Sequence, residues 1–226
     1  MEFWSIFVIL TTAIEATKLR TDAKCKILNV SLTQKIDNEG FHRELNWLLE
    51  RGADSLQCKL AIKLDVGEEM FINPDQIADL NRMGLLSVVI DGDVDVEVPS
   101  HLATKHTAYI FVPPFLNKVS LKLPFHLRYQ RAQISGGYGK VVVNKPDILA
   151  ICPKPCGKTE LRAPCDMTNR VKCAWNNVSY EALFDETELL VPVGDLDDYP
   201  LVSIVTLLLG CAGCIYTLSV LSTTPL

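Results

Sequence analysis

The sequence predicts a mainly β protein: an antiparallel, β-sandwich-like domain with one short helix, followed by a single C-terminal transmembrane helix. Apolar and polar residues alternate over several stretches, as they do in a strand with one buried face. Only one stretch carries clear helix start and stop signals, and residues 201–220 contain no charged side chain. Many short strands with one small helix are typical of an antiparallel sandwich. The 226 residues allow one domain plus a small addition.

The N-terminus begins with an apolar run that is too short to span a bilayer. Residues 3–10 read FWSIFVIL, and Ala13 and Ala16 supply small residues for a cleavage site. We therefore expect a signal peptide over residues 1–16. The segment before the apolar run carries Glu2 and no Lys or Arg, so a buried N-terminal strand remains the alternative.

The clearest strand signals lie between residues 56 and 66. Apolar residues occupy every second position there: Leu56, Cys58, Leu60, Ile62, Leu64 and Val66. Residues 93–98 alternate in the same way, with Val94, Val96 and Val98 between acidic residues, and predict another strand. Short apolar runs at 109–112, 141–143 and 189–193 lie between turn signals and predict three more.

One short helix is predicted after residue 73. Asn73 is a favourable N-cap, Pro74 suits the first helical position, and Ile77 and Leu80 are at helical spacing. Gly84 is expected to end the helix.

The stretch LPFHLRYQR, residues 123–131, looks chemically like an active site, yet its spacing is that of a strand. Apolar residues alternate from 119 to 129, so His126 and Arg128 belong to the polar face. Pro124 cannot donate to a ladder, which predicts an edge strand or a bulge. We expect Phe125, His126, Leu127 and Arg128 to contact a partner, and a merely solvated face is the alternative.

Residues 200–221 are predicted to form the transmembrane helix, because about 20 apolar residues are needed to cross the hydrocarbon core. With the signal peptide, this places residues 17–199 in a lumen and leaves 222–226 as a short cytosolic tail. A tail anchor with a cytosolic domain is the competing topology. Gly210, Cys211, Gly213 and Cys214 form a run of small residues that would let a second helix approach, although such residues are also tolerated against lipid.

Cysteine usage favours the secretory pathway. Six cysteines precede the apolar helix, and an even number in a secreted domain suggests three disulfides. Fifteen pairings are possible; we expect Cys25 to pair with Cys58, and Cys152, Cys156, Cys165 and Cys173 to pair among themselves. Zinc binding is the weaker interpretation, because the spacings within the cluster do not give close pairs at both ends.

Two N-x-S/T sequons begin at Asn29 and Asn177 and are predicted glycosylation sites.

The formal charge of −5 and the dispersed basic residues argue against nucleic-acid binding. Asp91 and Asp93 form a D-x-D pair that could hold a metal in a glycosyltransferase, but they also fit the polar face of the predicted strand. We expect no catalytic residue, metal, cofactor or small-molecule substrate of its own. An immunoglobulin-like cell-surface receptor is the alternative function.

An ordered set of short motifs resembles the PIG-X family. The motifs are EGFHREL (39–45), CKLAIKLDV (58–66), INPDQIADL (72–80), LPFHLRYQR (123–131), VVVNKPDILAIC (141–152), APC (163–165), CAWNN (173–177) and VPVG (191–194). They cover nearly all of the predicted domain.

The resemblance implies a type I protein of the endoplasmic reticulum membrane that acts as the non-catalytic stabilising subunit of glycosylphosphatidylinositol (GPI) mannosyltransferase I. The implied partner is a PIG-M-like catalytic subunit, which transfers the first mannose from dolichol-phosphate mannose to the GPI precursor. The resemblance carries no catalytic residues to this chain.

Overall fold

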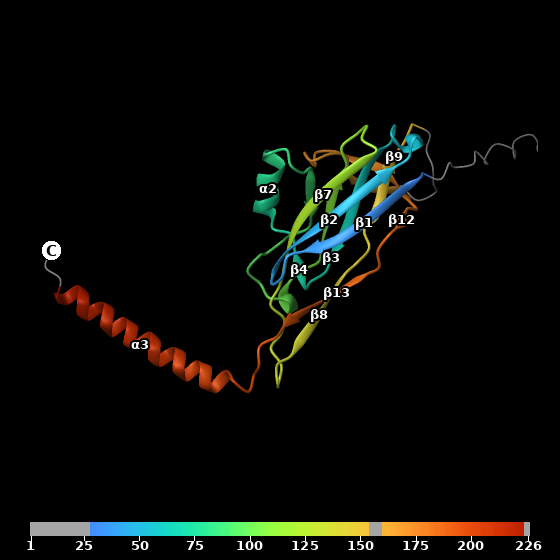
Figure 1. The fold of residues 1–226 in the computed structure, drawn as a ribbon. Helices are drawn as coiled ribbons and strands as arrows, with labels where there is room; N and C mark the ends of the chain where they lie inside the picture. The colour runs from blue at the N-terminus through green and yellow to red at the C-terminus, as the bar shows by residue number, and fades with distance from the viewer. Residues whose placement is uncertain (1–27, 154–159, 224–226) are drawn as a thin grey trace, which may run out of the picture.

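The computed structural model describes residues 28–153 and 160–223. The predicted signal peptide, Cys25 and Cys156 lie outside these residues. The described chain forms two stacked β-sheets, a two-stranded ribbon and a long C-terminal helix (Figure 1). The predicted β-sandwich-like fold with one short helix and an apolar C-terminal helix is confirmed.

The first sheet has five strands. In spatial order they are β12 (Glu181–Ala182), β1 (Val30–Asp37), β2 (His42–Arg51), β7 (Lys118–Leu127) and β4 (Met70–Phe71). Its neighbours pair antiparallel except β1 and β12, which form a short parallel pair.

The second sheet has six strands that all pair antiparallel. In spatial order they are β10 (Glu160–Pro164), β11 (Lys172–Val178), β9 (Asp147–Ile151), β3 (Lys59–Val66), β6 (His106–Phe111) and β5 (Val88–Asp91). The separate ribbon pairs β8 (Tyr138–Val143) with β13 (Thr187–Pro192). Two 3-10 turns, η1 (Ala53–Ser55) and η2 (Ser100–Leu102), lie in the connections.

The main core lies between the sheets, because alternate residues of facing strands point inward. Trp47 from the first sheet and Ile62 from the second are both almost completely buried in the same cluster. Val141 and Leu189 bring the β8–β13 ribbon into this cluster, so the ribbon is fixed to the sandwich. A smaller cluster around Trp175 also includes residues of β3, β5, β6, β9 and β10.

Helix α2 (Pro74–Arg82) has the predicted local design. The Asn73 side chain accepts hydrogen bonds from the backbone N–H groups of Asp75 and Gln76, which otherwise have no partner within the helix. Ile77 is buried, and Gly84 follows with a φ of 70°. The helix prediction is confirmed.

Strand β7 explains why a proline is tolerated at position 124. The N–H of Leu127 donates to the carbonyl of Phe41 on the β2 side, whereas that of Arg128 donates to Glu69 on the β4 side. The backbone N–H and C=O groups of the even-numbered residues of β7 therefore point away from β2 and toward the β4 side. On that side β4 reaches only Leu127 and His126, so Pro124 faces an unpaired edge. β7 is not the edge strand of the sheet, because β4 lies beyond it, but within the described residues its backbone has an edge at Pro124.

The two disulfides in the described residues differ from the expected pairing. Cys58 is joined to Cys152, so the predicted Cys25–Cys58 pair and the separate four-cysteine cluster are both wrong. The reason is register: Lys59 faces Ile151 across β3 and β9, which makes Cys58 and Cys152 the next opposing pair, with Cα atoms 4.3 Å apart. The second bridge joins Cys165 and Cys173 at the β10–β11 hairpin.

The strand predicted over residues 93–98 is absent, and this segment is a loop. Strand β5 ends at Asp91, and Gly92 follows with a φ of 116°. The Asp95 carboxylate accepts a hydrogen bond from the Glu97 backbone, which stabilises a turn in place of a ladder. Val96 is 37% exposed, so alternation in this segment does not produce a buried face.

Helix α3 (Tyr199–Thr223) follows the ribbon and projects away from the sandwich (Figure 1). Its 25 residues correspond to about 37 Å of helix. Its most apolar window has a mean hydropathy of 2.2, and none of that window is buried by the rest of the protein. The helix is long and apolar enough to cross a membrane.

Candidate partner-contact surfaces

The predicted contact strand at the end of β7 is mostly interior. Phe125, Leu127 and Arg128 are 1%, 4% and 3% exposed, which removes these side chains from direct contact with a partner. Alternation correctly placed Phe125 and Leu127 on the core side. It placed Arg128 on the open side, but that side is covered at this end of the strand.

Arg128 is covered by the loop that precedes η2. Its Nη1 donates to the carbonyl of Val98 at 2.7 Å, and its guanidinium lies 4.5 Å from the centroid of the Phe71 ring. The side chain therefore ties the 93–98 loop to β4 and β7. Its role in the described residues is structural.

His126 is half-buried beside α2. Its ring stacks on Phe71 at 5.0 Å, meets the edge of His42 at 4.6 Å and shares a hydrogen bond with the Gln76 amide oxygen. Burial, together with the charge of His42, lowers the pKa of His126. Of the four predicted strand contacts, only His126 retains substantial exposed surface.

The acidic residues that could have held a metal do not converge on one. Asp91 ends β5 and pairs with Lys172 at 3.3 Å, whereas Asp93 is exposed in the following loop. Among residues 28–153 and 160–223, no three His, Cys, Asp or Glu side chains are grouped so that they could hold a metal ion. Asp91 and Asp93 are therefore not part of such a group of three in the described chain.

An exposed apolar loop joins β6 to β7 and was not identified from the sequence. Phe115 is 78% exposed and has a φ of 64°, which is uncommon for a bulky residue. Buried Arg51 fixes the loop: its Nε donates to the carbonyl of Leu116 and its Nη2 to that of Pro113. Its backbone N–H also donates to Asn117. The loop is thus a supported structure that displays an aromatic side chain.

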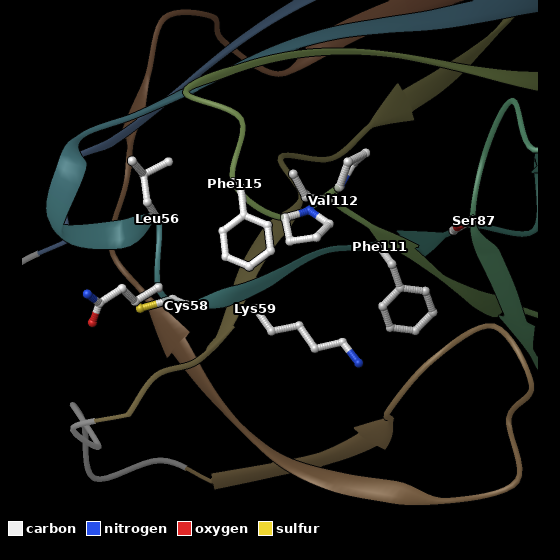
Figure 2. A pocket seen from close by; sticks show the side chains of 10 residues that line it. Leu56, Cys58, Lys59, Ser87, Phe111, Val112 and Phe115 are labelled. Atoms are coloured by element: carbon white, nitrogen blue, oxygen red, sulfur yellow. The ribbon is translucent and has the colours of Figure 1, made fainter.

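A groove of about 610 Å³ lies beside this loop. Figure 2 shows Leu56, Phe115 and Phe111 around the groove, with Lys59 extending along it. The Lys59 ammonium donates to the carbonyl of Cys165 and lies 5.8 Å from the Phe111 ring centroid, so this charge is already satisfied. The groove is lined mainly by apolar side chains and the Cys58 bridge. The sequence signal was a phenylalanine directly after Pro113 and Pro114, where a turn is expected.

The small residues of α3 gather on one helical face. Gly210, Gly213, Cys214 and Thr217 are three or four positions apart, and neighbouring Cys211 borders this face. The Thr217 hydroxyl donates to the carbonyl of Gly213, which satisfies that polar group within the helix. A Cβ atom added at Gly210 or Gly213 would meet nothing within 4 Å. We call Gly210, Gly213, Cys214 and Thr217 the small-residue face.

Both sequon asparagines are at the surface. Asn29 directly precedes β1 and is exposed, and Asn177 is exposed near the end of β11. Their positions are compatible with attached glycans, so both remain predicted glycosylation sites.

Comparisons with known proteins match most of the chain. A family model described as PIG-X / PBN1 matches residues 38–222, which include all of the sandwich except β1 and nearly all of α3. A human protein named "GPI alpha-1,4-mannosyltransferase I, stabilizing subunit" is 30% identical over 208 residues, covering 85% of this chain and 81% of that protein. Rat and mouse proteins of the same name are 29% and 28% identical over 193 residues; each alignment covers 80% of this chain and, respectively, 77% and 76% of the relative.

Proposed function

Because the chain belongs to the PIG-X/PBN1 family, we propose that it is the non-catalytic stabilising subunit of a GPI mannosyltransferase I. The observation that carries the proposal is the human relative, which is aligned over four fifths of its own length. The family match over residues 38–222 includes most of the sandwich and nearly all of the apolar helix.

The partner we propose is a PIG-M-like polytopic enzyme that transfers the first mannose from dolichol-phosphate mannose to the GPI precursor. Transfer from a lipid-linked sugar requires a cavity walled by several membrane helices. One apolar helix cannot form such a cavity, so the chemistry belongs to the partner. This chain contributes binding surfaces that favour the folded form of that partner.

We propose that the small-residue face of α3 packs against a helix of the catalytic subunit. Glycine at positions 210 and 213 leaves room for close backbone approach, which favours helix association in a membrane where hydrophobic burial contributes little. Burial of Phe125, Leu127 and Arg128 shifts the proposed contact from β7 toward α3.

Joint replacement Gly210→Leu and Gly213→Leu should reduce the catalytic subunit that co-purifies with this chain by roughly tenfold, equivalent to about 1.4 kcal/mol of lost packing. The measurement is quantitative recovery of both chains after mild detergent extraction. The matched control is Ala212→Leu with Ser219→Leu, which adds bulk to the opposite face of the helix. Equal recovery from both double variants would contradict packing through the small-residue face.

We propose that the sandwich lies in the lumen of the endoplasmic reticulum, with α3 anchored in its membrane. The wild-type chain should then lose mass on treatment with endoglycosidase H. That shift should disappear when Asn29→Gln and Asn177→Gln are combined, since both asparagines are exposed and accessible. The topology would be contradicted if the domain carried no glycan and was digested by protease added to the outside of sealed microsomes.

A further inference from the structure

The connection between β13 and α3 is held against a second segment of the sandwich. The N–H of Gln133 donates to the carbonyl of Gly194 at 3.0 Å, and the N–H of Leu196 donates back to Gln133 at 2.9 Å. Ser135 adds a backbone hydrogen bond to the Asp197 carboxylate at 3.3 Å. Residues 133–138, which we call the 133–138 turn, are therefore tied to the chain just before α3.

The 133–138 turn is itself well supported. Gly136 and Gly137 have φ values of 59° and 109°, which glycine adopts without steric cost, and the N–H of Gly136 donates to the carbonyl of Gln133. A Cβ atom at Gly136 would lie 3.3 Å from that of Asp195, so the two segments approach closely. The turn continues into β8, whose Val141 and Val143 are buried in the main core.

Apolar side chains are displayed beside the start of the helix. Ile134 and Tyr138 are 74% and 69% exposed, and Leu196 and Tyr199 are 46% and 68% exposed. Tyrosine is enriched at membrane–water interfaces because its ring is apolar and its hydroxyl remains hydrated. Figure 1 shows the end of the β8–β13 ribbon on the same side of the sandwich as the start of α3.

Only a short length of chain separates Leu196 from α3, the proposed membrane span. Leu196 lies three residues before the start of α3, which is at most about 10 Å of chain. The headgroup region adds roughly 5–8 Å on each side of the hydrocarbon core. The hydrogen bonds of Gln133 keep the 133–138 turn beside Leu196. With α3 in the bilayer, these side chains lie within reach of the interface.

We propose that the 133–138 turn is a second membrane contact, in which Ile134 and Tyr138 insert at the boundary between headgroups and acyl chains and fix the tilt of the sandwich. The ligand is a zwitterionic lipid surface, because Asp195, Asp197 and Asp198 in the same region would repel anionic headgroups. The inference rests on α3 as a membrane span and is independent of the proposed enzyme partner.

The test uses the full chain in phosphatidylcholine nanodiscs, with and without bromine high on the acyl chains. Ile134→Trp introduces a fluorophore at the turn, and the unsubstituted protein supplies the baseline from its own tryptophans. We expect bromine to quench roughly half of the added fluorescence, because interfacial side chains lie about 5–10 Å into the boundary region. Tyr138→Trp should respond in the same way.

Leu116→Trp is the matched control, because Leu116 is also apolar and exposed but precedes β7, whereas the 133–138 turn follows it. The ten residues of β7 hold the two ends of this strand about 30 Å apart. Leu208→Trp, in the middle of α3, reports insertion of the helix. Quenching at 134 and 138 but not at 116 supports the contact. Quenching at position 208 alone, equal quenching at 116, or no quenching at any position overturns it.

Discussion

Replacing Cys58 and Cys152 together with serine should lower the free energy of unfolding by about 4–5 kcal/mol. The bridge joins residues 94 positions apart, and the loop-entropy model assigns about this much to a loop of that length. Folded domains are stable by only about 5–15 kcal/mol, so the loss would leave the sandwich marginal. Pulse proteolysis of the full chain in detergent, at increasing urea concentration, measures the change.

The second bridge is the natural control for this experiment. Cys165 and Cys173 are separated by only eight positions, for which the same model gives about 2.5 kcal/mol. The Cys58/Cys152 double variant should therefore unfold at a clearly lower urea concentration than the Cys165/Cys173 double variant. The opposite order would show that loop entropy does not govern the contribution of these bridges.

Acidification should destabilise the sandwich because of His106. Its side chain is buried and its Nε2 accepts a hydrogen bond from the backbone N–H of Ile72. Burial, assisted by the positive charge of Arg128, lowers the pKa of His106 to about 4. Between that value and the usual pKa of about 6.5, the unfolded chain binds a proton that the folded chain does not.

The free energy of unfolding should consequently fall as the pH is lowered from about 6.5 toward 4, by up to roughly 3 kcal/mol from this group. His106→Gln keeps an acceptor for Ile72 but cannot titrate, so its stability should depend less steeply on pH over this window. The control is His101→Gln, which replaces an exposed histidine of η2 and should retain the wild-type slope. Equal slopes in all three proteins would exclude His106 as the main source.

Features encoded within a few neighbouring residues were predictable from the sequence. The cap at Asn73 defines α2 because the side chain and its two donors lie within three positions. The alternation through β3 and β7 correctly gave the faces that point into the main core, because the apolar set of each strand lies on that face. The apolar composition of α3 predicted a long helix for the same local reason.

Features that depend on tertiary neighbours were not predictable in this way. The 93–98 segment alternates, but no strand among the described residues pairs with it, so the pattern does not become a sheet. Arg128 is buried because the Val98 carbonyl, 30 positions away, accepts its hydrogen bond. The supported loop at Phe115 depends on Arg51, which is 65 positions from Leu116. The Cys58–Cys152 pair likewise follows from the register of β3 with β9.

A stabilising subunit acts by binding the folded form of its partner in preference to the unfolded form. At a hundredfold excess over the dissociation constant, such binding adds about 2.7 kcal/mol to the stability of the partner. This is a large part of the stability of a typical domain. Loss of the subunit should therefore expose the catalytic chain to degradation while leaving its chemistry intact.

The most direct measurement is GPI-anchored protein at the cell surface after this chain is deleted and the catalytic subunit is overexpressed back to its normal level. A pulse-chase in the same cells gives the half-life of the catalytic subunit with and without this chain. We predict a shortened half-life on deletion and recovery of surface GPI-anchored proteins once the enzyme level is restored. An unchanged deficiency at a normal enzyme level would contradict a stabilising role, because it would mean that this chain takes part in substrate handling or catalysis.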